Sequence, residues 1–166
     1  MSRTLKYIMV TAVAAVIVIF VTTGLFAVGS GASGGGSSFT RDPEEEARVA
    51  YERGQAFVEQ EQYSKAANSF RRAISYKRDF AEAYNMLGYS LRKDGKYKAA
   101  IKQYEKALTI NPDFAEAHEY IGEAYLGIGD RDSAWKHYTI LVGLGSEEAG
   151  ELLEKIEEHD RIVSKR

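Results

Sequence analysis

The sequence predicts an all-α protein in which stacked helix pairs follow a single transmembrane helix. Two observations predict this fold class: an uncharged apolar run over residues 7–28, and self-similarity at an offset of about 34 residues that aligns segments 47–80, 81–114 and 115–148. Beyond residue 42 there is no alternation of apolar and polar residues typical of strands. Repeats of this kind bury their apolar helix faces against their neighbours.

The N-terminal run predicts one membrane-spanning helix. As a helix rising ~1.5 Å per residue, residues 7–28 reach about 33 Å, enough to cross a hydrocarbon core of roughly 30 Å. Arg3 and Lys6 precede the run, and no charge follows it before Arg41, so the positive-inside rule places residues 1–6 in the cytoplasm. The prediction is a single-pass protein whose folded part is extracytoplasmic, facing the periplasm if the membrane is a bacterial inner membrane.

A cleaved secretory signal is the alternative to this anchor. Small residues at 27–29 and 30–32 resemble those that a signal peptidase accepts. The apolar core of a signal is typically ~7–15 residues long, so the longer run favours an uncleaved anchor with membrane lipid around residues 7–28. Residues 29–42 are rich in Gly and Ser and predict a flexible linker with an r.m.s. reach of about 20 Å, which keeps the folded part near the membrane.

Charge is confined to the part of the chain after the linker. Of the 22 basic residues, 20 lie in 41–166, together with all 24 acidic residues, which gives this part a net charge of −4. Such a balance gives no reason to expect nucleic acid, which is usually met by a basic face. The chain has no cysteine, which excludes disulfides, thiolate metal sites and a cysteine nucleophile.

The middle segment carries the most specific pattern. A large apolar residue and a Leu-Gly pair open its first helix, and a glycine ends that helix. A large residue, two alanines and an aromatic then line the second helix before a closing proline. These positions are Tyr84, Leu87, Gly88, Gly95, Tyr97, Ala100, Tyr104, Ala107 and Pro112. On these residues, segment 81–114 resembles a tetratricopeptide repeat (TPR), a pair of helices called A and B.

The flanking segments keep this pattern in part. The third segment repeats it with His118, Ile121, Gly122, Tyr125, Gly129, Ala134 and Tyr138, and departs from it at Leu141 and Ser146. The first keeps Gly54, Phe57, Tyr63, Ala66, Phe70 and Ala73, but has Arg53, Glu61 and Arg78 where Leu, Gly and Pro are usual. A polar residue is tolerated on the exposed face of a terminal repeat.

The resemblance implies a right-handed α-solenoid of three TPR helix pairs over residues 43–146. Asp42 as N-cap and Pro43 at the first helical position start the first helix. Residues 147–166 predict a capping helix and tail, with Leu152, Leu153, Ile156 and Val163 on one side of the helix.

In this family the concave surface, lined mainly by A helices, usually holds an extended peptide or partner segment. The resemblance therefore implies that partner binding uses the A-helix positions that the framework does not need. These are Arg48, Tyr51, Gln55, Val58 and Glu59 in the first repeat, Glu82, Asn85, Tyr89, Arg92 and Lys93 in the second, and Glu116, Glu119, Tyr120 and Glu123 in the third.

The glutamates at 116, 119 and 123 share one helical face and predict an acidic end beside a tyrosine-bearing middle. One interpretation is a groove that takes a basic or polar segment against these glutamates and apolar side chains against Tyr51 and Tyr89. The other is a solvated helix face, since Glu is a favourable surface residue in helices.

One subclass of the family binds the acidic C-termini of chaperones through Lys and Asn clamps on the A helices. The comparable positions here are Tyr51, Gln55, Met86, Glu116 and Tyr120. The resemblance therefore does not extend to that clamp.

No catalytic motif is present, and we expect neither an enzyme nor a bound cofactor or metal. His118, His137 and His159 fall in different predicted helices without the spacing of a metal motif. His118 takes the framework position of Tyr84, which predicts a packed core histidine. No Gly-rich phosphate loop follows a strand, and no serine sits in a nucleophile turn.

Two functions from different classes fit these observations. The first is a membrane-anchored scaffold or adaptor that binds a partner protein or peptide on the TPR surface. The second is a structural accessory subunit of a multi-subunit membrane complex that covers an extramembrane partner. Both imply a membrane-associated protein partner, and the adaptor is favoured because an anchored solenoid has no other evident task.

Overall fold

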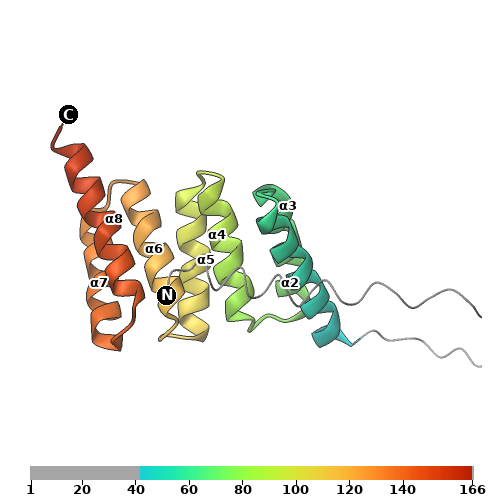
Figure 1. The fold of residues 1–166 in the computed structure, drawn as a ribbon. Coiled ribbons are helices and arrows are strands. Elements are labelled where there is room, and N and C mark those ends of the chain that lie inside the picture. The colour runs from blue at the N-terminus through green and yellow to red at the C-terminus, as the bar shows by residue number, and fades with distance from the viewer. Residues whose placement is uncertain (1–41, 166) are drawn as a thin grey trace, which may run out of the picture. The chain divides into compact units, whose positions relative to one another are not determined.

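The computed structural model describes residues 42–165, which form seven helices and no strand. In chain order they are α2 (Pro43–Glu59), α3 (Tyr63–Tyr76), α4 (Ala81–Lys93), α5 (Tyr97–Ile110), α6 (Ala115–Gly127), α7 (Arg131–Leu144) and α8 (Glu148–Val163). Figure 1 shows these helices standing side by side, from α2 at one end of the stack to α8 at the other. The prediction of an all-α solenoid is confirmed.

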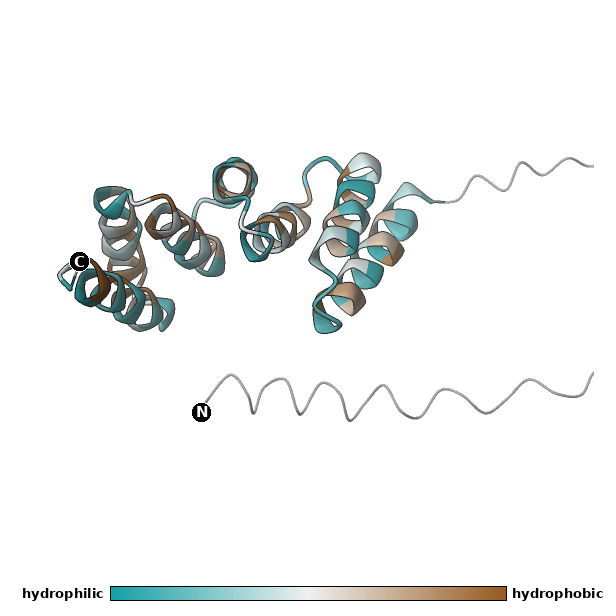
Figure 2. Ribbon diagram, turned by 90° about the horizontal axis from the view of Figure 1, so that it is seen from above, coloured by the Kyte–Doolittle hydropathy of each residue, from teal (hydrophilic) through white to brown (hydrophobic). Residues whose placement is uncertain are grey.

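The solenoid has an inner and an outer layer of helices. The A helices α2, α4 and α6 each pack on the B helix that follows, and α3 and α5 also pack on the next A helix. α2 contacts α4 and α4 contacts α6, whereas within residues 42–165 no contact joins α3 to α5 or α5 to α7. The A helices are therefore the closely spaced, inner layer. Figure 2 shows the resulting zigzag of consecutive helices from above.

Glycines on two A helices let an aromatic ring of the B helix pack against the helix backbone. A methyl group at Gly54 would lie 2.5 Å from Cε1 of Phe70, and one at Gly88 would lie 2.6 Å from Cε1 of Tyr104. Both rings are fully buried. No larger residue fits at either glycine without moving its ring, which is the physical reason for the Gly and aromatic pair in each repeat.

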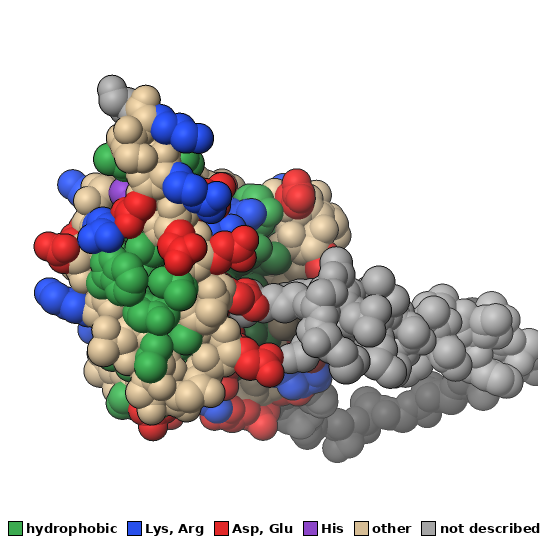
Figure 3. Space-filling model, turned by 60° about the vertical axis from the view of Figure 1, so that its left-hand side comes forward, with side chains coloured by type: hydrophobic (Ala, Val, Ile, Leu, Met, Phe, Trp, Pro, Cys, Tyr) green, Lys and Arg blue, Asp and Glu red, His purple; other side chains and the backbone are tan. Residues whose placement is uncertain are grey.

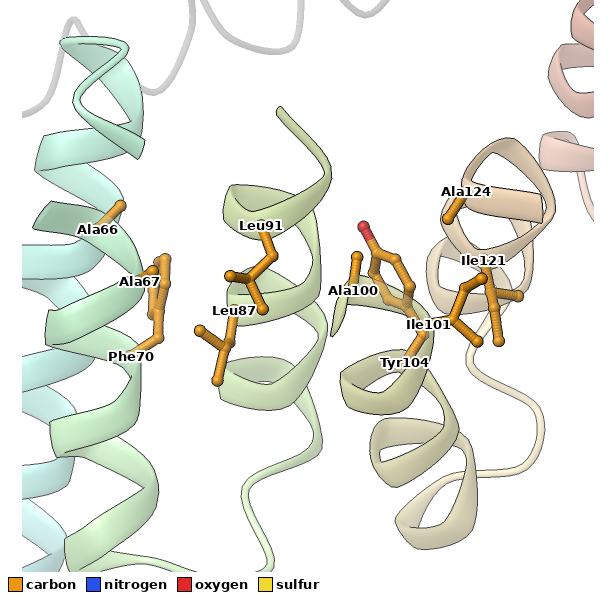
Figure 4. Packing of buried hydrophobic residues seen from close by; sticks show 10 residues of the cluster. All are labelled: Ala66, Ala67, Phe70, Leu87, Leu91, Ala100, Ile101, Tyr104, Ile121 and Ala124. Carbon is orange, nitrogen blue, oxygen red and sulfur yellow. The ribbon is translucent and has the colours of Figure 1, made fainter. Parts of the chain in front are cut away.

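Buried side chains of the B helices also join neighbouring helix pairs into one core cluster. Figure 4 shows Phe70 of α3 pointing toward Leu87 and Leu91 of α4, and Ile101 of α5 lying beside Ile121 of α6. Leu87 and Ile121 are 3% and 1% exposed because a B helix covers each of them. Each pair thus buries its apolar face on the next, as expected for a repeat protein.

The turns between A and B helices require a left-handed backbone. Gly95 and Gly129 adopt φ angles of 74° and 80° at the ends of α4 and α6. Glu61 follows α2 with a φ of 56° and is the one non-glycine residue with positive φ in the part of the chain that the structure describes. The turn geometry therefore persists where the sequence departs from Gly, and Glu61 adopts a conformation that favours glycine.

Substituting Glu61 by glycine is expected to raise the free energy of unfolding by about 0.5–1 kcal/mol, because glycine adopts this φ without steric cost. Gln60, with a φ of −88°, is the matched control, and Gln60→Gly is expected to lower stability slightly. Urea unfolding followed by circular dichroism measures both values. A loss of stability in Glu61→Gly would contradict the assignment of strain.

The last helix packs on both helices of the third pair. Leu152 and Ile156 of α8 are fully buried in a cluster with Ala134 and Leu141. A methyl group at Gly122 would lie 2.6 Å from Cδ2 of Leu152, so a side chain of α8 fills the space above this glycine. In the first two pairs that space holds an aromatic ring of the pair's own B helix.

On the predicted apolar side of α8, Leu152 and Ile156 are buried, whereas Val163 is not. Leu153 is half-buried, and Val163, the last residue of α8, is 54% exposed. Hydrophobic side chains gather on the surface at this end of the stack (Figure 3). Exposed hydrophobic residues of the last two helices are Ile140, Val142 and Leu144 on α7, and Ile162 and Val163 at the end of α8.

No helix within residues 42–165 combines the length and the apolar composition that a membrane span needs. The predicted transmembrane helix at 7–28 lies outside the described residues, as does the predicted linker up to residue 41. The anchor, the linker and the topology derived from them stay predictions.

Candidate binding surface on the inner helices

The residues predicted to bind a partner lie on α2, α4 and α6, the inner layer of the solenoid. Their side chains differ in exposure. Arg48, Gln55, Glu59, Glu82, Lys93 and Glu116 are exposed, Tyr51, Val58, Tyr89, Arg92, Tyr120 and Glu123 are half-buried, and Asn85 and Glu119 are buried. Burial of the last two corrects the prediction that this whole set faces solvent.

Arg92 occupies the centre of this surface. Its guanidinium carbon lies 5.4 Å from the ring centroid of Tyr89 and 5.3 Å from that of Tyr120. Its Nη1 donates a hydrogen bond of 2.5 Å to Oε2 of Glu123, and the two side chains are 13% and 18% exposed. Since Tyr89 is on α4 and Tyr120 and Glu123 are on α6, a shielded ion pair between aromatic rings joins two inner helices.

Lys93 and Tyr63 extend this centre toward α3. Nζ of Lys93 lies 5.6 Å from the ring centroid of Tyr63 and 6.0 Å from that of Tyr89. The two rings are 6.3 Å apart, edge to face. Tyr63 was expected only as a framework residue. One repeat later, Tyr97 is the equivalent of Tyr63 and Gly127 is the equivalent of Lys93, and Tyr97 packs over Gly127. A lysine in place of this glycine is the signal in the sequence that distinguishes Tyr63 from Tyr97.

The predicted acidic end is smaller than the sequence indicated. Glu119 is 3% exposed and Glu123 is paired with Arg92, so only Glu116 of the three presents an exposed carboxylate. Asn85 is 4% exposed, and its Oδ1 accepts no hydrogen bond from residues 42–165. The three glutamates lie on one face of α6, as their spacing predicts, but α4 lies close enough to cover part of that face.

A second cluster surrounds Tyr51 on α2. Its ring centroid lies 5.5 Å from that of Phe70 and 4.9 Å from that of Phe80. Burial raises the pKa of Tyr51 to about 12, with further contributions from the negative charges of Glu82 and Glu116. Tyr51 therefore stays a neutral phenol, and the two exposed glutamates make this side of the inner surface acidic.

His118 is a packed core histidine, as predicted, and it contacts a second histidine. It is 5% exposed, with Nε2 at 2.8 Å from the carbonyl oxygen of Pro112 and Nδ1 at 2.9 Å from Nδ1 of His137. The ring of His137 stacks on Tyr125 at 5.8 Å. Within residues 42–165 no group of three or more His, Cys, Asp or Glu side chains is placed to hold a metal ion.

Comparison with solved structures supports the fold. The first TPR of Spaghetti (RPAP3), bound to the HSP90 peptide SRMEEVD, is similar over 69% of this chain and 93% of its own, with 20% identity and a TM-score of 0.65. The second TPR domain of human RPAP3, in complex with the HSP70 peptide SGPTIEEVD, covers 69% and 98%, with 24% identity and a TM-score of 0.64. At these identities the likeness shows the fold alone.

The structure of MamA has a higher identity of 32% and a TM-score of 0.55, over 72% of this chain and 63% of MamA. No curated protein matches the chain. The family model described as TPR repeat matches residues 54–95 and 88–129, which include the helices that carry most of the inner surface. Residues 54–129 therefore match tetratricopeptide repeats, and residues 42–165 have the fold of an all-α TPR solenoid.

Proposed function

We propose that this chain is a membrane-anchored scaffold that binds a partner protein or peptide on the inner surface formed by α2, α4 and α6. The main support is the ordered centre, where Arg92 lies between Tyr89 and Tyr120 and is paired with Glu123. Tyrosine and arginine are enriched at protein interfaces. Because these side chains are already held in place, binding a partner orders few additional rotamers.

The charges around this centre indicate the chemistry of the partner segment. Glu82 and Glu116 make the side near Tyr51 acidic, whereas Lys93 on the other side forms no ion pair within residues 42–165. We expect an extended segment that places a basic side chain near the two glutamates, apolar side chains on the tyrosines, and an acidic group near Lys93.

This surface is proposed to take a different segment from the chaperone peptides bound by the RPAP3 domains. The positions comparable to the Lys and Asn clamp are Tyr51, Gln55, Met86, Glu116 and Tyr120. Glu116 is exposed, so a peptide whose charges are mainly acidic would meet a carboxylate of its own sign there.

The anchor is part of the proposal and rests on the apolar run at 7–28 with Arg3 and Lys6 before it. In this topology the repeats are extracytoplasmic, in the periplasm of a bacterium. The partner is then a membrane-associated or periplasmic protein, and the linker at 29–42 restricts it to the vicinity of the bilayer.

Purification of the full-length protein from its native membrane through a C-terminal tag, with mass spectrometry of what stays attached, tests the function. Glu82→Lys with Glu116→Lys, and separately Lys93→Glu, are expected to lower recovery of the same partner by about tenfold, equivalent to about 1.4 kcal/mol. The matched controls are Glu105→Lys and Lys102→Glu, exposed residues of α5 on the outer layer, which are expected to leave recovery unchanged.

The composition of the purified material separates the adaptor from the accessory subunit. Substoichiometric partners that the inner-surface variants release support the adaptor. A fixed, stoichiometric set of membrane subunits would support the structural subunit instead. Partners retained equally by the inner-surface variants and the controls would contradict the proposed surface.

A further inference from the structure

The first helix pair has an end face that the other pairs do not expose. In α4 and α6 the corresponding faces carry Leu87 and Ile121, which a preceding B helix buries. In α2 the equivalent residue is Arg53, which is exposed, and no helix of residues 42–165 packs over it. A face that is covered by a helix in two repeats is thus open in the first.

A groove runs along this face between α2 and α3. Its larger part has a volume of about 280 Å³ and is lined by Ala50, Arg53, Phe57, Lys65, Asn68, Ser69 and Arg72. A second hollow of about 170 Å³ shares Ala50, Arg53 and Arg72 and adds Glu46 and Val49. Buried Ala50 and half-buried Phe57 make the floor apolar, and Val49 is 49% exposed beside it.

Three cations surround this apolar floor. The guanidinium carbon of Arg53 and Nζ of Lys65 lie 5.6 Å and 5.7 Å from the ring centroid of Phe57. Nζ of Lys65 also donates to Oε1 of Gln62, and Nη2 of Arg72 donates to the hydroxyl of Tyr76. These hydrogen-bond acceptors are neutral, but Glu46, which lines the second hollow, also acts electrostatically on Arg72. The lining therefore carries three cations and one carboxylate, and its net positive charge favours charge-assisted hydrogen bonds with carboxylates supplied from outside.

We propose that this groove docks an acidic helical segment of a partner protein, at a site separate from the inner surface. A helix fits because helices α3 and α5 cover the equivalent faces of α4 and α6. Carboxylates complement Arg53, Lys65 and Arg72, and one apolar side chain of the segment covers the floor near Phe57. Residues 1–41 contain no Asp or Glu, so this chain's own N-terminal part does not supply the carboxylates.

Site-specific photo-crosslinking in the native cell tests the proposal with the full-length chain. A benzophenone amino acid replaces Asn68, an exposed residue lining the groove. The control label replaces Lys102, the equivalent residue of the next repeat on α5. We expect the label at 68 to form an adduct with another protein, at a segment of net negative charge whose Asp or Glu residues are spaced by three or four.

Charge reversal tests whether the cations hold this segment. Arg53→Glu with Arg72→Glu is expected to lower the yield of the adduct at least tenfold, whereas Lys102→Glu with Lys106→Glu on α5 leaves it unchanged. Arg53→Gln with Arg72→Gln, which adds no repulsion, lowers the yield to an intermediate level and covers the case in which the double Glu variant fails to fold. Lys93→Glu leaves the adduct intact, which separates this site from the inner surface.

Other outcomes would overturn the proposal. An adduct with a second copy of this chain would make the groove a self-association site, and one with lipid would make it a membrane contact. A crosslinked segment without acidic residues, an adduct insensitive to the Arg53 and Arg72 variants, or no adduct would leave the groove without the proposed occupant.

Discussion

Replacing Tyr104 by alanine is expected to lower the free energy of unfolding by about 3–5 kcal/mol, the range for removing a fully buried aromatic ring. Tyr104 packs against the backbone at Gly88 within its own pair, and its ring lies 6.2 Å from that of Tyr120 in the next pair. The cavity therefore opens where two repeats meet. Urea unfolding measures the loss, with Tyr104→Phe as the matched control that keeps the ring and changes stability by about 1 kcal/mol or less.

The effect of a methyl group at Gly88 is expected to change sign with the residue at 104. In the native chain, Gly88→Ala places Cβ 2.6 Å from the Tyr104 ring and costs about 1–3 kcal/mol. With alanine at 104 the ring is gone, and Gly88→Ala then stabilises by up to about 1 kcal/mol through helix propensity. A double-mutant cycle measures the difference. An equal cost in both backgrounds would show that the glycine does not serve the ring contact.

The internal repeat made most of the fold predictable, but the repeat pattern does not predict how the third helix pair packs. Gly88 and Tyr104 recur one repeat earlier as Gly54 and Phe70, and the structure packs both pairs in the same way. The same interval assigns Tyr138 to Gly122, but Leu152 of α8 fills that space. Within residues 42–165, α8 packs on both α6 and α7, and no spacing within a repeat encodes the contact of Leu152 with Gly122.

The inner surface was predictable as a set of positions but not as a set of exposed groups. The 3.6-residue period places Glu116, Glu119 and Glu123 on one face of α6. Which of them meets solvent depends on how closely α4 approaches, a distance between repeats that a single helix does not reveal. Arg92 and Glu123 are 31 residues apart, so their ion pair also depends on that approach.

The histidine pair is another contact that depends on packing between helices. The carbonyl oxygen of Pro112 can only accept, so Nε2 of neutral His118 carries the proton and donates to it. Nδ1 of His118 then has a lone pair and accepts from Nδ1–H of His137. The ring of His137 lies between those of His118 and Tyr125, and its burial there favours the neutral form.

Acidification is therefore expected to destabilise the fold through His137. Burial, with smaller contributions from His118 and Lys136, lowers the pKa of His137 from 6.5 to about 4. The folded state then binds this proton less tightly than the unfolded state. The stability from neutral His137 is fully present above pH 6.5 and is lost as the pH falls from 6.5 toward 4. At 1.36 kcal/mol per pKa unit, the total is about 3 kcal/mol.

The variant His137→Asn separates this effect from the titration of carboxylates in the same pH range. The asparagine amide can still donate a hydrogen bond to Nδ1 of His118, but it does not ionise. We expect the native chain to be the more stable one near neutral pH and to lose that advantage as the pH falls toward 4. The difference between the two unfolding free energies, measured by urea titration at each pH, isolates His137 because the carboxylates are common to both chains. Parallel loss of stability in the two chains would contradict a depressed pKa at His137.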